Sequence, residues 1–297
     1  MAELVFWAAL ATVAYVYAGY PLLVFALSRL RPRPVRRGDI TPRVTFLIAA
    51  YNEAAAIRQK LDNTLALEYP AEALEVIVVS DGSTDGTDEI VTGEYGNRVR
   101  LLKLGGRQGK TLGQNRGAAA ATGEILVFSD ATTMYRPQAL RALVRNFADP
   151  SVGLVTGQVL YGLETGAAAD RGRAAYWNYE TFLRDAESRF HSVLGSAGCV
   201  YALRKGIYTP LPAEVISDVC QTVKVVQQGY RAIVDNDALV YEPAESRGIG
   251  EELERRARVI ARGLRGKWFL RDFFHPLRQA PHVHTTVSTR LSQRRSS

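Results

Sequence analysis

The sequence predicts an α/β domain whose mostly parallel sheet carries helices on both faces, preceded by one apolar helix. Over residues 43–147, short β-branched segments alternate with segments whose apolar residues recur every three or four positions. This alternation is typical of parallel strands joined by helices. An uncharged run over residues 4–27 comes before it. The chain has 297 residues, enough for one large domain with a substantial core.

The uncharged run LVFWAALATVAYVYAGYPLLVFAL is long enough to cross a bilayer of about 30 Å. Only Glu3 carries charge on a side chain before it, whereas a cleaved signal peptide has a basic start. We therefore expect an uncleaved transmembrane anchor over residues 1–30, with a buried core helix as the alternative. Five arginines follow within residues 29–37, so the positive-inside rule predicts a single-pass protein of the inner or plasma membrane with its domain in the cytoplasm.

The net charge of +7 owes much to a Pro/Arg linker, RPRPVRRGDITP over residues 31–42, and to the tail. This placement favours anionic lipid head groups over nucleic acid as a partner. The tail, residues 271–297, is polar and irregular and is predicted to be disordered. The two cysteines, Cys199 and Cys220, have no metal-ligand spacing, which argues against a disulfide framework and a structural zinc site.

The predicted domain covers residues 43–270, and its elements follow in a regular order. Strands are expected at 43–51, 74–80, 98–104 and 124–130. Between and after them, helical patterns occur within 53–69, 88–95, 109–123 and 137–147. A further helix stops at Gly229, and an amphipathic helix covers residues 251–263.

Polar residues follow three of the predicted strands: Tyr51-Asn52-Glu53, Ser80-Asp81-Gly82-Ser83 and Ser129-Asp130. In parallel sheets, ligands bind beyond the carboxyl ends of the strands, so these side chains should gather in one crevice. Taken alone, Asp81-Gly82 could be only a turn. No G-x-G-x-x-G follows the first strand and no P-loop is present, which disfavours a dehydrogenase and a P-loop enzyme.

Four motifs, AAYNE, VVSDGSTDGT, GKTLGQNRGA and VFSDATT, occur in this order at characteristic spacing. Over residues 42–265 the chain resembles glycosyltransferase family 2, inverting enzymes with a Rossmann-like GT-A fold that include cellulose- and hyaluronan-synthase-like proteins. The resemblance implies a UDP-sugar donor, with Asp81 accepting a hydrogen bond from the uracil ring. The implied nucleotide-sugar site consists of Ala50, Tyr51, Asn52, Glu53, Asp81, Gly82, Ser83, Lys110, Asn115, Asp130 and Arg258.

Asp130 matches the first acid of the family's D-x-D motif, which implies a divalent cation, Mg²⁺ or Mn²⁺, between carboxylate and diphosphate. Thr132 stands where the second acid belongs, so cation affinity should be lower or another ligand should complete the site. His191 is one candidate for that ligand, although a lone histidine is more often structural. A lone lysine would more often be a solvated side chain, and only the Gly-Lys context and the position of Lys110 favour a place in the site.

Asp218 matches the second acid of the family's E-D or D-D motif, which implies that it is the general base. Ser217 replaces the first acid. Without the resemblance, Asp218 or Ser217 could simply cap a helix. Arg258 matches the arginine of the Q-x-x-R-W motif of processive relatives, but Arg255 and Val259 replace the glutamine and tryptophan. This puts processive polymerisation in doubt, and the alternative is an amphipathic helix with a solvated basic face.

The resemblance implies inverting transfer of a sugar to a hydroxyl acceptor, a glycan or a lipid, at the cytoplasmic membrane face. Polysaccharide biosynthesis with partner subunits fits the same family. The alternative is a catalytically weak, membrane-attached protein that binds nucleotide sugars or assists assembly. The missing second carboxylate and the altered Q-x-x-R-W motif favour this alternative, whereas Asp130 and Asp218 oppose it.

Overall fold

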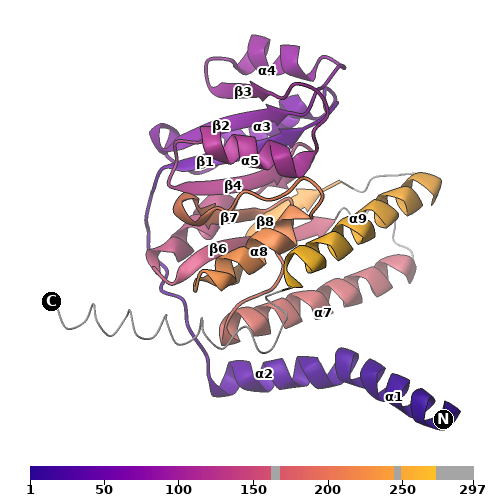
Figure 1. Cartoon of the computed structure of the whole chain (residues 1–297). Coiled ribbons are helices and arrows are strands. Elements are labelled where there is room, and N and C mark those ends of the chain that lie inside the picture. Colours follow the sequence, from indigo (N-terminus) through magenta and orange to yellow (C-terminus); the bar gives the residue numbers. More distant parts are fainter. Residues whose placement is uncertain (162–167, 244–248, 272–297) are drawn as a thin grey trace.

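The computed structural model describes residues 1–161, 168–243 and 249–271. In this part of the chain, eight strands form one mixed sheet in the order β3-β2-β1-β4-β7-β6-β8-β5 (Figure 1). The fold therefore confirms the predicted α/β class with helices on both faces of a mostly parallel sheet. The predicted tail lies outside the described residues except for Arg271.

The four strands predicted from the sequence form the parallel half of the sheet. In the register, Val44 pairs with both Leu74 and Ile125, so β1 lies at the centre and β2 and β4 flank it. The order of the strands across the sheet reverses at β1, and sheets of this kind bind ligands at the carboxyl edge beside such a reversal. The strands are β1 (Val44–Ala50), β2 (Leu74–Ser80), β3 (Val99–Lys103) and β4 (Ile125–Asp130).

Helices cover both faces of this half because the side chains of β1 alternate. Phe46 and Ile48 pack in one core with α3 and α6, whereas Leu47 packs in the other with α5 and α8. Gly117 of α5 allows close approach, since a Cβ there would lie 3.0 Å from both Leu47 and Val79. The helices are α3 (Ile57–Leu65), α4 (Thr87–Tyr95), α5 (Lys110–Ala120), α6 (Ala139–Val144) and α8 (Ser217–Gln227).

The second half of the sheet is mixed. β7 (Tyr201–Arg204) runs antiparallel to both β4 and β6, and β5 (Met134–Tyr135) runs antiparallel to β8. β6 (Val152–Tyr161) and β8 (Arg231–Glu242) pair in parallel. Short 3₁₀ turns occur at η2 (Ala71–Ala73), η3 (Arg145–Ala148) and η4 (Lys205–Ile207).

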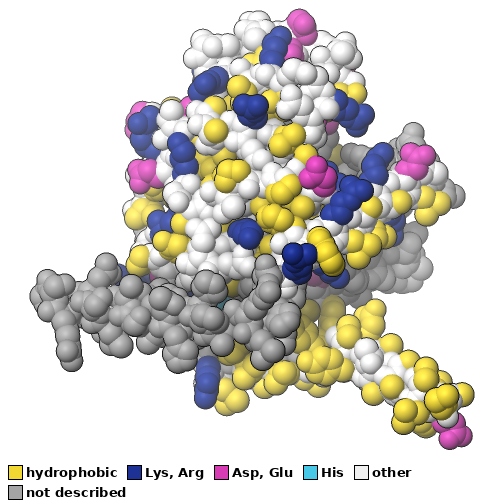
Figure 2. All heavy atoms as spheres, in the orientation of Figure 1, with side chains coloured by type: hydrophobic (Ala, Val, Ile, Leu, Met, Phe, Trp, Pro, Cys, Tyr) yellow, Lys and Arg dark blue, Asp and Glu magenta, His cyan; other side chains and the backbone are white. Residues whose placement is uncertain are grey.

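A single long helix precedes the domain. It comprises α1 (Ala2–Ala14), the π-helical turn η1 (Tyr15–Gly19) and α2 (Tyr20–Leu30), and it is long and apolar enough to cross a membrane. Figure 2 shows its free part as almost entirely hydrophobic. In contrast, α2 packs along α7 (Ala168–Phe190), where the Tyr20 hydroxyl donates to Glu187 Oε1 at 2.6 Å.

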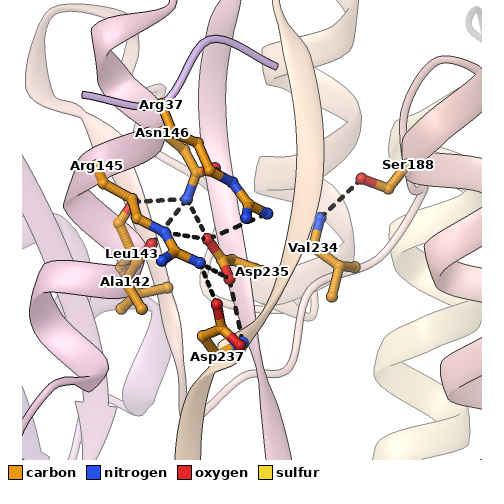
Figure 3. A network of polar contacts seen from close by, with 9 residues as sticks. All are labelled: Arg37, Ala142, Leu143, Arg145, Asn146, Ser188, Val234, Asp235 and Asp237. Carbon is orange, nitrogen blue, oxygen red and sulfur yellow. Dashed lines mark hydrogen bonds and ion pairs between the residues drawn. The ribbon is translucent and has the colours of Figure 1, made fainter. Parts of the chain in front are cut away.

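The linker at residues 31–42 lies on the domain. The Arg33 N–H donates to the Arg189 carbonyl at 2.8 Å, and the Gly38 N–H donates to that of Arg145 at 3.0 Å. The Arg37 guanidinium donates to Asn146 and lies 3.6 Å from the buried carboxylate of Asp235 (Figure 3). The linker therefore joins the apolar helix to the domain through fixed contacts.

The C-terminal helix α9 (Ile249–Phe269) is longer than the predicted 251–263. Its end packs against α8, where Leu270 joins a small core with Leu211 and Val223. Most of the predicted apolar stripe is not buried, because Leu253, Ile260 and Leu264 are all exposed.

Candidate active site

The loops after β1 and β2 are joined by hydrogen bonds at the carboxyl edge of the sheet. Asn52 has a φ of 55°, and its Oδ1 accepts from the Thr84 N–H at 2.9 Å. Its own N–H donates to Ser83 Oγ at 3.1 Å, and the Asp81 N–H donates to the Ala50 carbonyl at 2.9 Å. The Glu53 N–H donates to Thr87 Oγ1.

Gly82 is required for this arrangement. Its φ of 78° lies in the left-handed region, and a Cβ would stand 2.9 Å from the carbonyl carbon of Gly106.

The carboxylate of Asp81 connects β2 to the next loop. It accepts the N–H groups of Gln108 at 2.6 Å and Gly109 at 2.8 Å, immediately before Lys110. The Arg107 guanidinium from the same loop lies 4.3 Å from the ring centre of Tyr51. Arg107 was not predicted from the sequence, since only its position opposite Tyr51 distinguishes it from a solvated arginine.

Lys110, Asp130 and Asp218 come together around Gly198. Lys110 Nζ lies 2.5 Å from Asp130 Oδ1 and donates to the Gly198 carbonyl at 3.2 Å. A Cβ on Gly198 would stand 2.9 Å from Asp218 Oδ2, so only glycine fits beside this carboxylate. Burial lowers the pKa of Lys110, but the nearby carboxylates of Asp130 and Asp218 outweigh it and raise that pKa overall.

Asp218 lies in the first turn of α8. The N-cap of this helix is Ile216, so the alternative that Asp218 or Ser217 is the cap residue is wrong. Asp218 Oδ1 accepts the Val219 N–H at 2.7 Å. Burial raises the pKa of Asp218 above its ordinary value, although that N–H and Lys110 act in the opposite direction. A carboxylate of raised basicity at a site edge suits a general base.

The described residues contain no group of three or more His, Cys, Asp and Glu side chains that could hold a metal ion. The side chain of Asp130 is about one-third exposed, and its Oδ1 forms an ion pair with Lys110 Nζ. His191 instead contacts Ser192 Oγ, and burial, together with the charges of Arg33 and Arg231, lowers its pKa.

Lys60 was not singled out in the sequence, yet it lies directly behind Asp130. It is fully buried in α3, and its Nζ donates to Ser129 Oγ at 2.8 Å and the Thr133 carbonyl at 2.5 Å. Burial lowers its pKa to about 7. Its spacing from Ile57 and Thr64 places it on the buried face of α3, but lysine is almost never fully buried, so its burial was not predicted.

Two predicted residues have other contacts. The amide of Asn115 donates to the Leu211 carbonyl at 2.7 Å and accepts the Tyr208 hydroxyl at 2.8 Å, which ties α5 to residues 208–211. Arg258 is exposed on α9. One turn later, Arg262 connects α9 to the site by donating to Thr111 Oγ1 at 2.8 Å.

The family model described as glycosyl transferase family 2 matches residues 45–209. Poly-beta-1,6-N-acetyl-D-glucosamine synthase of Staphylococcus aureus is 35% identical over 130 residues, which cover 43% of this chain and 31% of that protein. Glycosyltransferase AglE of Haloferax volcanii is 29% identical over 226 residues, 73% of this chain and 72% of that protein. The matched region thus spans about a third of the length of the S. aureus synthase.

Two solved structures are similar over most of the chain. The mannosyltransferase PcManGT from Pyrobaculum calidifontis, in complex with GDP-Man and Mn²⁺, has a TM-score of 0.72 and 28% identity, covering 92% of this chain and 78% of that one. S. aureus TarS in complex with UDP-GlcNAc has a TM-score of 0.54 and 18% identity, covering 69% and 60%. The TarS match bears on the fold alone.

Proposed function

Because the chain belongs to glycosyl transferase family 2, we propose that it is an inverting enzyme that transfers a sugar from a UDP-sugar to a hydroxyl acceptor, a glycan or a lipid. The observation that carries this proposal is the convergence of Lys110, Asp130 and Asp218 at the carboxyl edge of β1 and β4. A single displacement needs a base close to the site that holds the charged diphosphate. Asp218 would supply the base, and Lys110 and Asp130 would supply the diphosphate site.

In the proposed reaction, Asp218 accepts the proton of the acceptor hydroxyl as that oxygen attacks the anomeric carbon. The new C–O bond forms while the bond from that carbon to the diphosphate oxygen breaks. The nucleoside diphosphate leaves from the opposite face, so the anomeric configuration inverts. Lys110 stabilises the charge that develops on the leaving diphosphate.

A divalent cation fits this site in one specific way. Mg²⁺ and Mn²⁺ prefer oxygen ligands, and Mg²⁺ is commonly held by one or two carboxylates together with substrate phosphates. Asp130 would supply the protein carboxylate, and the donor diphosphate would supply the remaining negative oxygens. When bound, the cation would neutralise part of the charge on the diphosphate. The Mn²⁺ in the PcManGT complex supports this assignment.

We assign the nucleoside to the loops that Asn52, Asp81 and Ser83 hold together, with the uracil ring near the Asp81 carboxylate. Each oxygen of that carboxylate already accepts one backbone N–H, and a carboxylate has lone pairs for further bonds. The similar structures contain GDP-Man and UDP-GlcNAc, so the fold accommodates both bases. The choice of UDP rests on Asp81.

We also propose that the helix Ala2–Leu30 is a single-pass anchor that holds the domain at the cytoplasmic face. Residues 2–18 are exposed, with one hydrogen bond to the described part of the domain, in which the Tyr179 hydroxyl donates to the Tyr17 carbonyl at 3.2 Å. At about 1.5 Å per residue they are roughly 25 Å long, a little shorter than the bilayer core. Tyr20 and the arginines after it would then lie at the interface. Deleting residues 1–30 should release the protein from membranes, and full retention would contradict the anchor.

The test of the proposed function is a panel of UDP- and GDP-sugars. Calorimetry with Mn²⁺ measures binding to the full chain in detergent, and nucleoside diphosphate release measures turnover. We expect one UDP-sugar to bind and to be cleaved, with inversion visible by NMR. Binding without turnover for every donor would favour the alternative of a catalytically weak binding protein.

A further inference from the structure

Arg262 of α9 contacts the starts of both helices that carry the proposed catalytic groups. Lys110 is the first residue of α5, and Asp218 lies in the first turn of α8. Arg262 Nη2 donates to Thr111 Oγ1, directly after Lys110, at 2.8 Å. The same nitrogen donates to the carbonyl of Val215, three residues before Asp218, at 2.9 Å. One side chain therefore joins two segments that are 104 residues apart in the sequence.

Thr111, Val215 and Arg262 form what we call the helix-start junction. Within it, Thr111 Oγ1 itself donates to the Val215 carbonyl at 3.0 Å. Arg262 Nη2 also donates to the Ala213 carbonyl at 3.2 Å, in the loop before α8. Thr111 and Val215 are buried, and Arg262 is half-buried. Hydrogen bonds shielded from water are electrostatically stronger than those in water, so the junction restrains the distance between the two helix starts.

The attachment of α9 to the domain does not depend on Arg262 alone. Nearer the end of the helix, Leu270 packs in an apolar core with Val223 of α8. A Cβ on Gly266 would stand 3.0 Å from Cys220 Sγ, so the two helices also approach closely at that point. These apolar contacts hold α9 against α8. The polar contacts of Arg262 therefore act on the loop before α8 and on the start of α5.

We infer that Arg262 is a positioning residue for sugar transfer, because it fixes the start of α5 relative to that of α8 and so sets the distance between Lys110 and Asp218. The inference rests on the proposed function and adds to it a residue that touches neither donor nor acceptor. Reacting groups must be held about 3–3.5 Å apart, and a misplacement of about 1 Å can cost about 10²-fold in rate. A side chain behind the catalytic groups can therefore control the rate.

The test uses the full chain in detergent with its cation and the UDP-sugar that it cleaves, and nucleoside diphosphate release gives kcat and the donor KM. Arg262→Met keeps an unbranched apolar stem but loses every hydrogen-bond donor. We expect kcat to fall about tenfold while the donor KM stays within about twofold of wild type, because the geometry of the reacting groups changes and donor binding does not. Arg265→Met removes an exposed arginine of the same helix and should be as active as wild type.

The melting temperature separates positioning from a loss of stability. It should hardly move in Arg262→Met, because the Thr111 hydroxyl and the Val215 carbonyl keep the bond between them. Thr111→Val, which removes that hydroxyl from the other side of the junction, should also lower kcat. In the double variant the combined loss should be smaller than the product of the two single losses, since both residues act through one set of contacts. Thr111→Val alone answers the question if Arg262→Met does not fold.

An unchanged kcat in folded Arg262→Met would overturn the inference, and so would an equal loss in Arg265→Met. A raised donor KM with unchanged kcat would place Arg262 in donor binding and would also overturn it. Strictly multiplicative losses in the double variant would show that Thr111 and Arg262 act independently, which contradicts a shared junction. All these results require an active wild type. A wild type that binds and cleaves no nucleotide sugar would instead refute the proposed function, and the inference with it.

Discussion

Two charged clusters in this protein use similar residues in opposite ways. The linker cluster consists of Arg37, Arg145, Asn146, Asp235 and Asp237 (Figure 3), and the proposed catalytic cluster consists of Lys110, Asp130, Gly198 and Asp218. In the first, the fully buried Asp235 binds Arg145 through two parallel bonds of 2.8 and 2.9 Å and accepts Asn146 at 2.7 Å. In the second, Lys110 and Asp130 are each about one-third exposed.

This difference in burial distinguishes a cluster that stabilises the fold from one that is open to a ligand. A buried carboxylate whose oxygens are all engaged is costly to disturb and has nothing left to offer a ligand. In an ion pair that is about one-third exposed, either side chain can exchange its partner for a diphosphate or a cation at little cost. Burial and the number of hydrogen bonds therefore assign the roles, although both clusters combine basic and acidic residues.

The largest effect on activity should come from Asp218→Asn. The amide is nearly isosteric but cannot take the acceptor proton near neutral pH, so transfer should fall by about 10²–10⁴-fold. UDP affinity and melting temperature should barely change. Glu214→Gln, an exposed residue of the preceding loop, is the control. Full transfer by Asp218→Asn would show that this carboxylate is not the base.

The linker cluster should show the opposite pattern. Asp235→Ala leaves Arg145 and Asn146 without their buried partner, so the free energy of unfolding should fall by about 3–5 kcal/mol. Chemical denaturation measures the loss, and kcat at a temperature where the variant is folded should stay normal. Asp237→Ala removes the exposed partner of Arg145 and should cost much less. Equal losses in the two variants would refute the role of burial.

Asp81→Ala tests the nucleoside end of the site. We expect UDP binding to weaken by about 1–3 kcal/mol, because a hydrogen bond to the ring would be lost. The same carboxylate also holds the backbone of Gln108 and Gly109, so pyrophosphate affinity is measured in parallel by calorimetry. Loss confined to UDP indicates base recognition. Equal loss for both ligands would instead assign Asp81 to positioning the loop before Lys110.

Lys60 differs from the basic residues of both clusters, because its buried amine donates to neutral oxygens and not to a carboxylate. Burial lowers its pKa to about 7 from 10.5, so the folded protein loses this proton before the unfolded chain does. Between these pH values the unfolded state binds more protons, and the Lys60 contribution to the unfolding free energy should rise with pH, by at most about 1.4 kcal/mol per unit. Denaturation of wild type and Lys60→Met is measured from roughly pH 6 to roughly pH 11, and the difference in unfolding free energy between them should rise with pH between the two pKa values.

The smallest effect should come from Arg37→Ala. Its guanidinium is half-exposed and lies 3.6 Å from Asp235, so its loss should cost under about 1 kcal/mol. The melting temperature of the full chain measures this. A cost comparable to that of Asp235→Ala would mean that the linker contributes far more to the fold than its exposure indicates.

The parallel half of the sheet was predictable because each of its strands is a continuous apolar run that ends in polar residues. The segments 74–80 and 124–130 agree with β2 and β4 to within one residue. The four strands of the mixed half, β5 to β8, were not predicted. Their pairing is antiparallel or out of chain order, and local periodicity does not encode partners. The helix predicted to end at Gly123 ends at Ala120, because Thr122 and Gly123 are held by Glu75 and Thr45 at the start of β4.

For the site, motif spacing predicted which loops meet. Structure was needed for the rest, because contacts such as that of Gly198 with Asp218 join segments that are distant in sequence or depend on backbone position. The roles of Asp81 and Asp218 remain predictions that the experiments above test, and those of Asp130 and Arg258 remain predictions.

The contacts of Arg33 and Gly38 with the domain have a geometric consequence. A protein on a loose tether samples a hemisphere of positions above its attachment point. Here the segment that could have served as the tether lies against the domain, so the carboxyl edge of β1 and β4 stays at one height and one tilt relative to the apolar helix. If that helix spans a bilayer, the protein meets membrane-bound acceptors by diffusion in two dimensions. The length of the helix outside the bilayer then sets the distance from the lipid at which an acceptor hydroxyl must lie.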